Sequence, residues 1–290
     1  MTGPQAAILS GNRLHLQHGP IDLVIGADGD RETAITAARN RFATVLEELV
    51  TELPLLRMPV SKSPQGAVAQ RMFNACRPHA GQVFVTPMAA VAGAVADEVL
   101  SAMVATASLS RAYVNNGGDI AVHLRGAETF HVAMAGLSGA GFGHIDLSSH
   151  SPSRGIATSG RGGRSLSMGI ADSVTVLARD AAAADVAATL IANAVDLPDH
   201  PAITREPAED LQPDSDLRQR LVVTQLGSLT RTEVAQALSN GAAYAQDMLT
   251  QGLIDAAALT LCGQTRVIGK PLQSPVLPRP STQERIAFHA

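Results

Sequence analysis

Residues 111–124 read Arg-Ala-Tyr-Val-Asn-Asn-Gly-Gly-Asp-Ile-Ala-Val-His-Leu. Apolar runs with β-branched and aromatic residues stand on both sides of a polar turn, a pattern typical of two paired strands. The two glycines of the turn adopt positive φ without steric cost, as a tight hairpin connection requires. This stretch therefore predicts a β-hairpin whose turn lies at residues 115–119.

Helical and strand patterns continue on both sides of this hairpin. Apolar residues recur at helical spacing over residues 31–49 and 87–103, and residues 181–195 form an alanine-rich helical stretch. Alternating or β-branched runs at residues 13–25 and 173–178 predict strands. This mixture predicts an α+β fold in which mixed or antiparallel sheets pack against helices.

The composition places the chain among globular proteins. Hydrophobic residues make up 46% of its 290 residues and charged residues 17%, which excludes a disordered chain, a coiled coil and a fibre. Its 22 Lys and Arg residues stand against 26 Asp and Glu residues, a net charge of -4, and Trp is absent. Without a basic surface or an aromatic stacking platform, we expect no nucleic-acid partner.

Two further patterns concern location. The apolar stretch at residues 83–96 contains Pro87 and is too short to cross a bilayer as a helix, which takes about 20 residues. Residues 1–19 carry polar residues and histidines throughout and resemble no signal peptide. We therefore expect a cytoplasmic protein with no membrane partner.

The chain is long enough for one large domain with an ample core. We expect residues 1–271 to form that domain, with a surface loop or boundary at residues 198–216, which are rich in proline and acidic residues. Residues 272–290 are rich in proline and predict a flexible tail. The number of subunits stays open, and an oligomer is compatible with these patterns.

Two glycine turns carry groups suited to a coenzyme. The first holds Asn116, Gly117, Gly118 and Asp119, and the second holds Thr158, Ser159, Gly160, Arg161 and Arg164. Glycines expose backbone N–H groups to a ligand, and an arginine offers a bidentate fork to a diphosphate. Each turn taken alone also fits a plainer interpretation, as a hairpin turn and as a solvated loop.

A third cluster lies in the alanine-rich stretch. Asp185 and Thr189 are four residues apart, so both oxygens project from one face of a helix. A carboxylate and a hydroxyl suit a hard cation such as Mg²⁺. Alternatively, Asp185 merely complements the positive end of its helix dipole.

The order of these motifs resembles the ApbE-like superfamily. The motifs are Tyr-Val-Asn-Asn-Gly-Gly-Asp-Ile at residues 113–120, Thr-Ser-Gly at 158–160 and Ala-Asp-Val-Ala-Ala-Thr at 184–189. The resemblance covers residues 83–195, and the compact chain is similar to the cytoplasmic branch of the superfamily. It implies an ApbE-like fold. That superfamily includes Mg²⁺-dependent flavin transferases, which cleave FAD and attach FMN to a protein threonine.

The resemblance also implies roles for individual residues. Asp185 and Thr189 would bind Mg²⁺, together with a main-chain carbonyl from residues 89–93. The Gly-Gly-Asp and Thr-Ser-Gly motifs would line the pocket of a small-molecule coenzyme or nucleotide, with FAD or FMN as the cofactor.

The chain departs from the transferases after the Thr-Ser-Gly motif. The transferases continue with a His and an Asp-Pro-x-Thr-Gly segment, which residues 161–173 lack. We expect His144 and Asp146 to supply a substitute acid–base pair, since an imidazole titrates near neutral pH. Alternatively, His144 is a surface histidine at the end of a strand. We therefore expect an enzyme that cleaves FAD or transfers FMN. The alternatives are a flavin-binding protein without catalysis and an enzyme that makes another coenzyme, such as a pterin.

Overall fold

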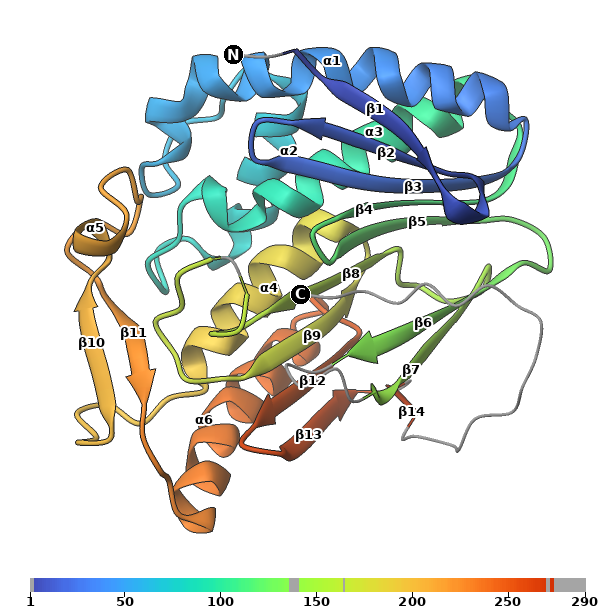
Figure 1. The fold of residues 1–290 in the computed structure, drawn as a ribbon. Helices are drawn as coiled ribbons and strands as arrows, with labels where there is room; N and C mark the ends of the chain where they lie inside the picture. Colours follow the sequence, from blue (N-terminus) through green and yellow to red (C-terminus); the bar gives the residue numbers. More distant parts are fainter. Residues whose placement is uncertain (1–2, 136–140, 164, 270–271, 274–290) are drawn as a thin grey trace.

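Antiparallel strands dominate the computed structural model, which describes residues 3–135, 141–163, 165–269 and 272–273. A nine-stranded sheet has the order β1-β2-β3-β4-β5-β8-β9-β12-β13 (Figure 1). Its strands are β1 (Gln5–Leu9), β2 (Arg13–His18), β3 (Ile21–Gly29), β4 (Leu109–Asn116), β5 (Asp119–Leu124), β8 (Gly155–Ser159), β9 (Ser173–Ala178), β12 (Ala256–Leu261) and β13 (Gln264–Gly269). The predicted hairpin is β4–β5, with Asn116 opposite Asp119.

A layer of helices covers one face of this sheet (Figure 1). They are α1 (Arg31–Leu56), α2 (Ala67–Cys76), α3 (Val91–Thr106), α4 (Ala181–Ala194) and α6 (Arg231–Thr250). Short 3-10 turns are η1 (Ser10–Asn12), η2 (Arg77–His79) and η3 (Pro87–Ala90), the last of which leads directly into α3. The main core lies between this helical layer and the sheet, so the fold is α+β, as predicted.

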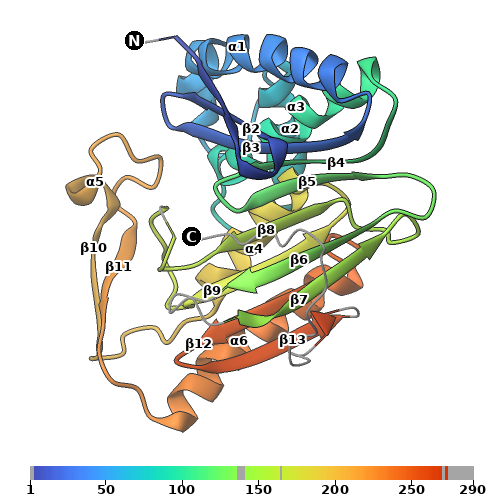
Figure 2. The same ribbon diagram turned by 45° about the vertical axis from the view of Figure 1, so that its right-hand side comes forward.

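A small second sheet covers part of the other face. It consists of β6 (Thr129–Ala135), β7 (Gly141–Ser148) and β14 (Leu272–Gln273), and Figure 2 shows β6 and β7 in front of the large sheet. Phe130, Val132, Ile145 and Leu147 point inward and form a second core with residues of β4, β5, β8 and β9. Alternate residues on β6 and β7 therefore face away from the large sheet.

A hairpin stands apart from both sheets. It comprises β10 (Ile203–Pro207), α5 (Ala208–Leu211) and β11 (Leu221–Leu226), and we refer to residues 203–226 as the arm. Figure 1 shows the arm at the left edge of the molecule, away from both sheets. Residues 198–216, the predicted loop or boundary, thus contain β10 and α5.

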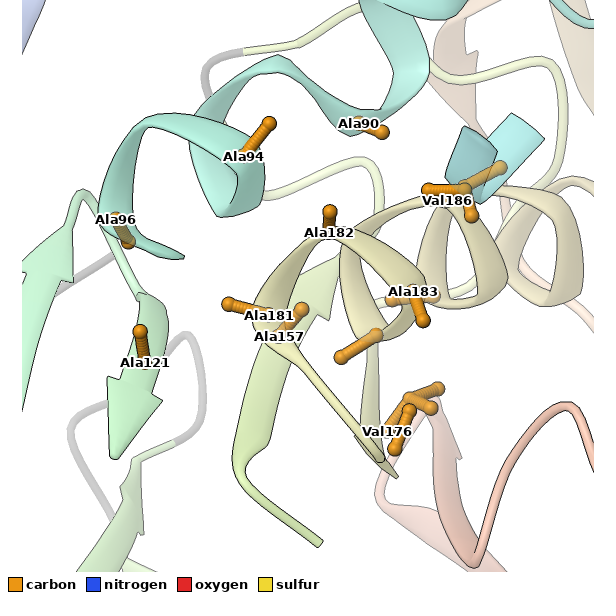
Figure 3. Packing of buried hydrophobic residues seen from close by; sticks show 14 of the residues in the cluster. Ala90, Ala94, Ala96, Ala121, Ala157, Val176, Ala181, Ala182, Ala183 and Val186 are labelled. Carbon is orange, nitrogen blue, oxygen red and sulfur yellow. The ribbon is translucent and has the colours of Figure 1, made fainter. Parts of the chain in front are cut away.

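Helix α3 is the apolar centre of the helical layer. Residues Pro87–Thr106 are long and apolar enough to span a membrane by length and composition, yet half of that window is buried within the protein. Figure 3 shows Ala90, Ala94, Ala181 and Ala182 on facing turns of η3, α3 and α4. Such small side chains allow the two helix backbones to approach closely, which is what a core helix requires.

Candidate functional site

Helices α3 and α4 each place a carboxylate at the N-terminus of the other. Asp185 Oδ2 on α4 accepts a hydrogen bond from the Gly93 N–H, at 3.0 Å, in the first turn of α3. In return, Asp97 on α3 accepts from Ala181 N and Ala182 N, at 3.0 and 2.9 Å. The first N–H groups of a helix have no partner within the helix and carry partial positive charge, so both carboxylates are stabilised there.

The first glycine turn is attached to this pair of helices. Asn116 Nδ2, at the end of β4, donates to the Ala92 carbonyl at 3.1 Å. The turn itself closes through Gly118 N, which donates to Asn115 Oδ1 at 2.9 Å. Gly117 and Gly118 have φ values of 63° and 113°, a region that glycine adopts readily. Asn116 and Asp185 therefore flank the start of α3 from two sides.

The second glycine turn lies beside the first. Thr158 N, near the end of β8, donates to Asp119 Oδ1 on β5 at 3.3 Å. The Thr158 hydroxyl is 2.9 Å from the Thr175 hydroxyl on β9. Thr158, which is exposed, and Ser159 are the last two residues of β8 and lead to Gly160. The structure thus brings the two predicted coenzyme-binding motifs together at one end of the sheet.

Arg161 forms a salt bridge with a carboxylate in this structure. Its Nε and Nη2 donate to Asp172 Oδ1 at 3.0 and 2.6 Å, while Asp172 Oδ2 accepts from Cys262 N at 2.6 Å. This network holds the segment after Gly160 against the β9 and β12 edge. A contact between Arg161 and a diphosphate stays a prediction. Arg164, the other predicted arginine, lies outside the described residues.

Burial governs the charge state of Asp97 and of the partly exposed Asp185. Burial raises the pKa of Asp185, the N–H groups of Gly93 and Ala92 lower it, and the charge of Asp97 raises it. Burial likewise raises the pKa of Asp97 to about 7, against the opposing effect of the Ala182 and Ala181 N–H groups. Each carboxylate therefore sits where a proton or a cation would relieve the cost of burying charge.

Hard oxygen donors surround the start of α3. They are the Asp185 carboxylate and the Ala92 carbonyl. Thr189 is partly exposed and follows Asp185 by one turn of α4, so its hydroxyl projects from the same face of that helix. Within the described residues no three His, Cys, Asp or Glu side chains gather as a metal site. One carboxylate with neutral oxygens fits Mg²⁺, which keeps several of its own waters, better than it fits zinc.

The titration of Asp97 gives a first testable prediction. Its folded pKa, about 7, exceeds the ordinary value of about 3.9, so the folded state holds a proton that the unfolded chain releases. Its contribution to stability is complete below about pH 4 and is lost as the pH rises through 7. The advantage in unfolding free energy of wild type over Asp97→Asn should therefore shrink between about pH 5 and pH 8.

Urea denaturation of the two metal-free proteins at several pH values measures this difference. Wild type and variant must be compared with each other because burial also lowers the pKa of His79 and of His123. These histidines make both proteins more stable as the pH rises, which is opposite to the effect of Asp97, and their contribution cancels in the comparison. A difference that grows toward pH 8 would contradict the assigned charge state of Asp97.

The predicted acid–base pair lies elsewhere. His144 Nε2 is 3.4 Å from Asp146 Oδ2 on β7, and His131 Nδ1 of β6 is 2.6 Å from Asp146 Oδ1. Because Ile145 and Leu147 point into the second core, His144 and Asp146 lie on the outer face of the small sheet. The structure pairs the two residues with each other but not with Asp185 or the glycine turns.

Sequence reasoning missed Asp97 and Asp172, each of which holds backbone N–H groups at the candidate site. A signal for Asp97 was present, since Asp97 and Glu98 are the two acids within an otherwise apolar helical run. A surface depression of about 440 Å³ lies elsewhere, against α1 and the end of α3 at Thr106, and shares no residue with this site.

Comparison with known proteins assigns the family. A protein-family model described as AbpE bacteria matches residues 5–267. The chain therefore belongs to this family and is a member of the ApbE-like superfamily, which confirms the resemblance of its motifs.

Two archaeal relatives extend the comparison. A UPF0280 protein of Methanothrix thermoacetophila is 41% identical over 165 residues, covering 52% of this chain and 64% of the relative. A UPF0280 protein of Methanopyrus kandleri is 35% identical over 182 residues, covering 59% of this chain and 69% of the relative. The chain thus spans about two thirds of the length of these relatives.

A solved structure is also similar over most of its length. The apo form of the Pseudomonas stutzeri flavinyl transferase ApbE aligns with a TM-score of 0.44 and 12% identity, covering 93% of each chain.

Proposed function

We propose that the protein is a Mg²⁺-dependent enzyme that acts on a flavin nucleotide in the cytoplasm, cleaving FAD or transferring its FMN part. One observation carries the proposal: the Asp185 carboxylate sits at the first turn of α3, which the first glycine turn contacts through Asn116. The second glycine turn adjoins the first through Thr158 and Asp119. Membership of the ApbE-like superfamily, some members of which cleave FAD, supports the same choice of substrate.

In this mechanism the residues of the chain bind and orient. Asp185, Thr189 and the Ala92 carbonyl would hold Mg²⁺, which offsets the charge that develops on phosphate oxygens. The exposed backbone around Gly117 and Gly118 would face the diphosphate or the flavin edge. Cleavage breaks the bond between the bridging oxygen and the phosphorus of FMN. AMP leaves with the bridging oxygen, and water or a protein hydroxyl replaces it on FMN.

A non-catalytic flavin-binding protein is the second candidate. It is favoured by the position of His144 and Asp146 on the outer face of the small sheet, where they do not contact the described site residues. General acid–base catalysis needs the base within hydrogen-bond reach of the proton that it abstracts. The fold would then hold the coenzyme without turning it over.

Incubation with FAD and Mg²⁺ distinguishes these functions. We expect FMN and AMP to form, in amounts that EDTA suppresses, as measured by chromatography of the products. Retention of FAD without products, seen as a flavin absorbance that remains with the protein, would favour the binding protein. A protein that neither binds nor cleaves FAD would refute the choice of flavin and direct attention to another coenzyme, such as a pterin.

A further inference from the structure

The arm joins two walls of the candidate site. One wall is the chain that leads into η3 and α3, and the other is the chain that follows the second glycine turn. Figure 1 shows β10 and β11 outside the nine-stranded sheet, at the edge of the molecule. Within the described residues, β10 and β11 pair with each other and not with that sheet. Ile203, Val223 and Leu226 pack against the main core, and polar groups of the arm bond to residues on two sides of it.

At one end the arm holds the approach to α3. Asp216 Oδ2, between α5 and β11, accepts from the Thr86 hydroxyl at 2.5 Å. Thr86 is 2% exposed, and its carbonyl accepts from Ala89 N and from the Cys76 thiol, at 3.1 and 3.4 Å. Nearby, the Arg220 guanidinium lies 3.5 Å from the centre of the Phe84 ring.

The Thr86 hydroxyl links the arm to the helix that begins after it. Thr86 is the N-cap residue of η3, and threonine in that position ordinarily accepts a hydrogen bond from its own helix. In this structure the hydroxyl makes no such capping bond and donates to Asp216 instead. Burial raises the pKa of the Cys76 thiol, and the charges of Asp185 and Asp216 raise it further.

At the other end the arm holds the second wall. Arg205 donates to the Met168 carbonyl and to Asp196 Oδ1, both at 2.5 Å, and Val223 N donates to the Ser167 carbonyl at 2.8 Å. Ser167 and Met168 belong to the segment that runs from the Thr-Ser-Gly turn to β9. The arm thus spans from this segment to Thr86.

We propose that Asp216 is a positioning residue of the coenzyme site, which through Thr86 fixes the start of α3 relative to the arm and the second glycine turn. The inference rests on the proposed function, because it assigns the effect to binding of the flavin nucleotide. Loss of the Asp216 acceptor would leave the buried Thr86 hydroxyl without its partner. The turn that presents Ala92 and Gly93 would then be free to shift.

Three variants test this role. Asp216→Ala removes the acceptor, whereas Asp216→Asn keeps an oxygen that can accept from Thr86. Asp214→Ala is the matched control, since Asp214 is an exposed acid on the same segment. Hydrogen–deuterium exchange of residues 86–93 in the ligand-free protein measures how firmly the start of α3 is held. Calorimetric titration with FAD in the presence of Mg²⁺ measures the affinity of the coenzyme site.

We expect Asp216→Ala to raise exchange of residues 86–93 and to weaken FAD binding by about tenfold or more, the effect of losing one charge-assisted hydrogen bond. Asp216→Asn should keep most of the wild-type protection from exchange and most of the FAD affinity. Asp214→Ala should behave as wild type. Wild-type exchange in Asp216→Ala would overturn the proposal, as would raised exchange with unchanged FAD affinity. If wild type binds no FAD, the proposed function fails, and exchange alone decides whether Asp216 positions α3.

Discussion

Replacing Asp185 by asparagine is expected to abolish the Mg²⁺-dependent binding of FAD, with a loss of about hundredfold or more in affinity. The hard cation would lose the charged oxygen of its site, while the shape of the side chain is nearly unchanged. The amide of the variant would still offer one oxygen to the Gly93 N–H, so the fold should survive. Thr189→Val should weaken binding less, because a neutral hydroxyl contributes less to the cation.

Asp180→Asn is the matched control for this experiment. Asp180 caps the same helix by accepting from Ala183 N at 2.8 Å, and asparagine caps a helix about as well as aspartate does. Calorimetric titration with FAD, with and without Mg²⁺, compares the three variants with wild type, and thermal unfolding checks that each is folded. Intact Mg²⁺-dependent binding in Asp185→Asn would show that Asp185 is only a structural partner of α3.

Gly93→Ala is expected to lower the unfolding free energy of the protein strongly. A Cβ atom at this position would lie 2.2 Å from the Ala181 carbonyl oxygen and 2.7 Å from Ala182 N, both backbone atoms that cannot rotate away. Helices α3 and α4 would have to separate, which would lengthen the bonds made by Asp97 and Asp185 as well. Overpacking of this kind costs about 3 kcal/mol, more than the roughly 1 kcal/mol that alanine gains over glycine within a helix.

Urea denaturation measures this loss of unfolding free energy. Gly126→Ala provides the comparison, because no atom lies within 4 Å of its added Cβ and only the positive φ of 61° is unfavourable. That strain costs about 1 kcal/mol. A Gly93→Ala protein as stable as wild type would mean that the two helices do not approach as closely as described.

Local patterns predicted much of the fold because they depend on neighbours in the sequence. The hairpin at residues 111–124 follows from turn glycines between apolar runs. The helical spacing is recognised over residues 31–49, whereas α1 continues through Pro54 to Leu56. Pro54 removes one backbone hydrogen bond near the end of the helix, and the chain stays helical there because Arg57 N still donates to the Leu53 carbonyl at 3.0 Å.

The candidate site was predicted only in its parts. The sequence shows glycine turns and an Asp–Thr pair at helical spacing, and the structure brings the two turns together through Asp119 and Thr158. The partner of Arg161 was not predictable, because Asp172 reaches it through the path of the loop and of β9. The outer position of His144 and Asp146 depends on which face of the small sheet meets the large one.

Turn glycines, apolar periodicity and the spacing of oxygen-bearing side chains can be recognised from the order of the residues alone. The contacts of Asp185 with the start of α3 and of Asp97 with the start of α4 arise only when the two helices pack together. These bonds join residues more than 80 positions apart. The reason is physical. Periodicity and capping patterns act within one or two turns of chain, whereas the N–H groups of a helix end donate to whichever carboxylate the packing brings to them.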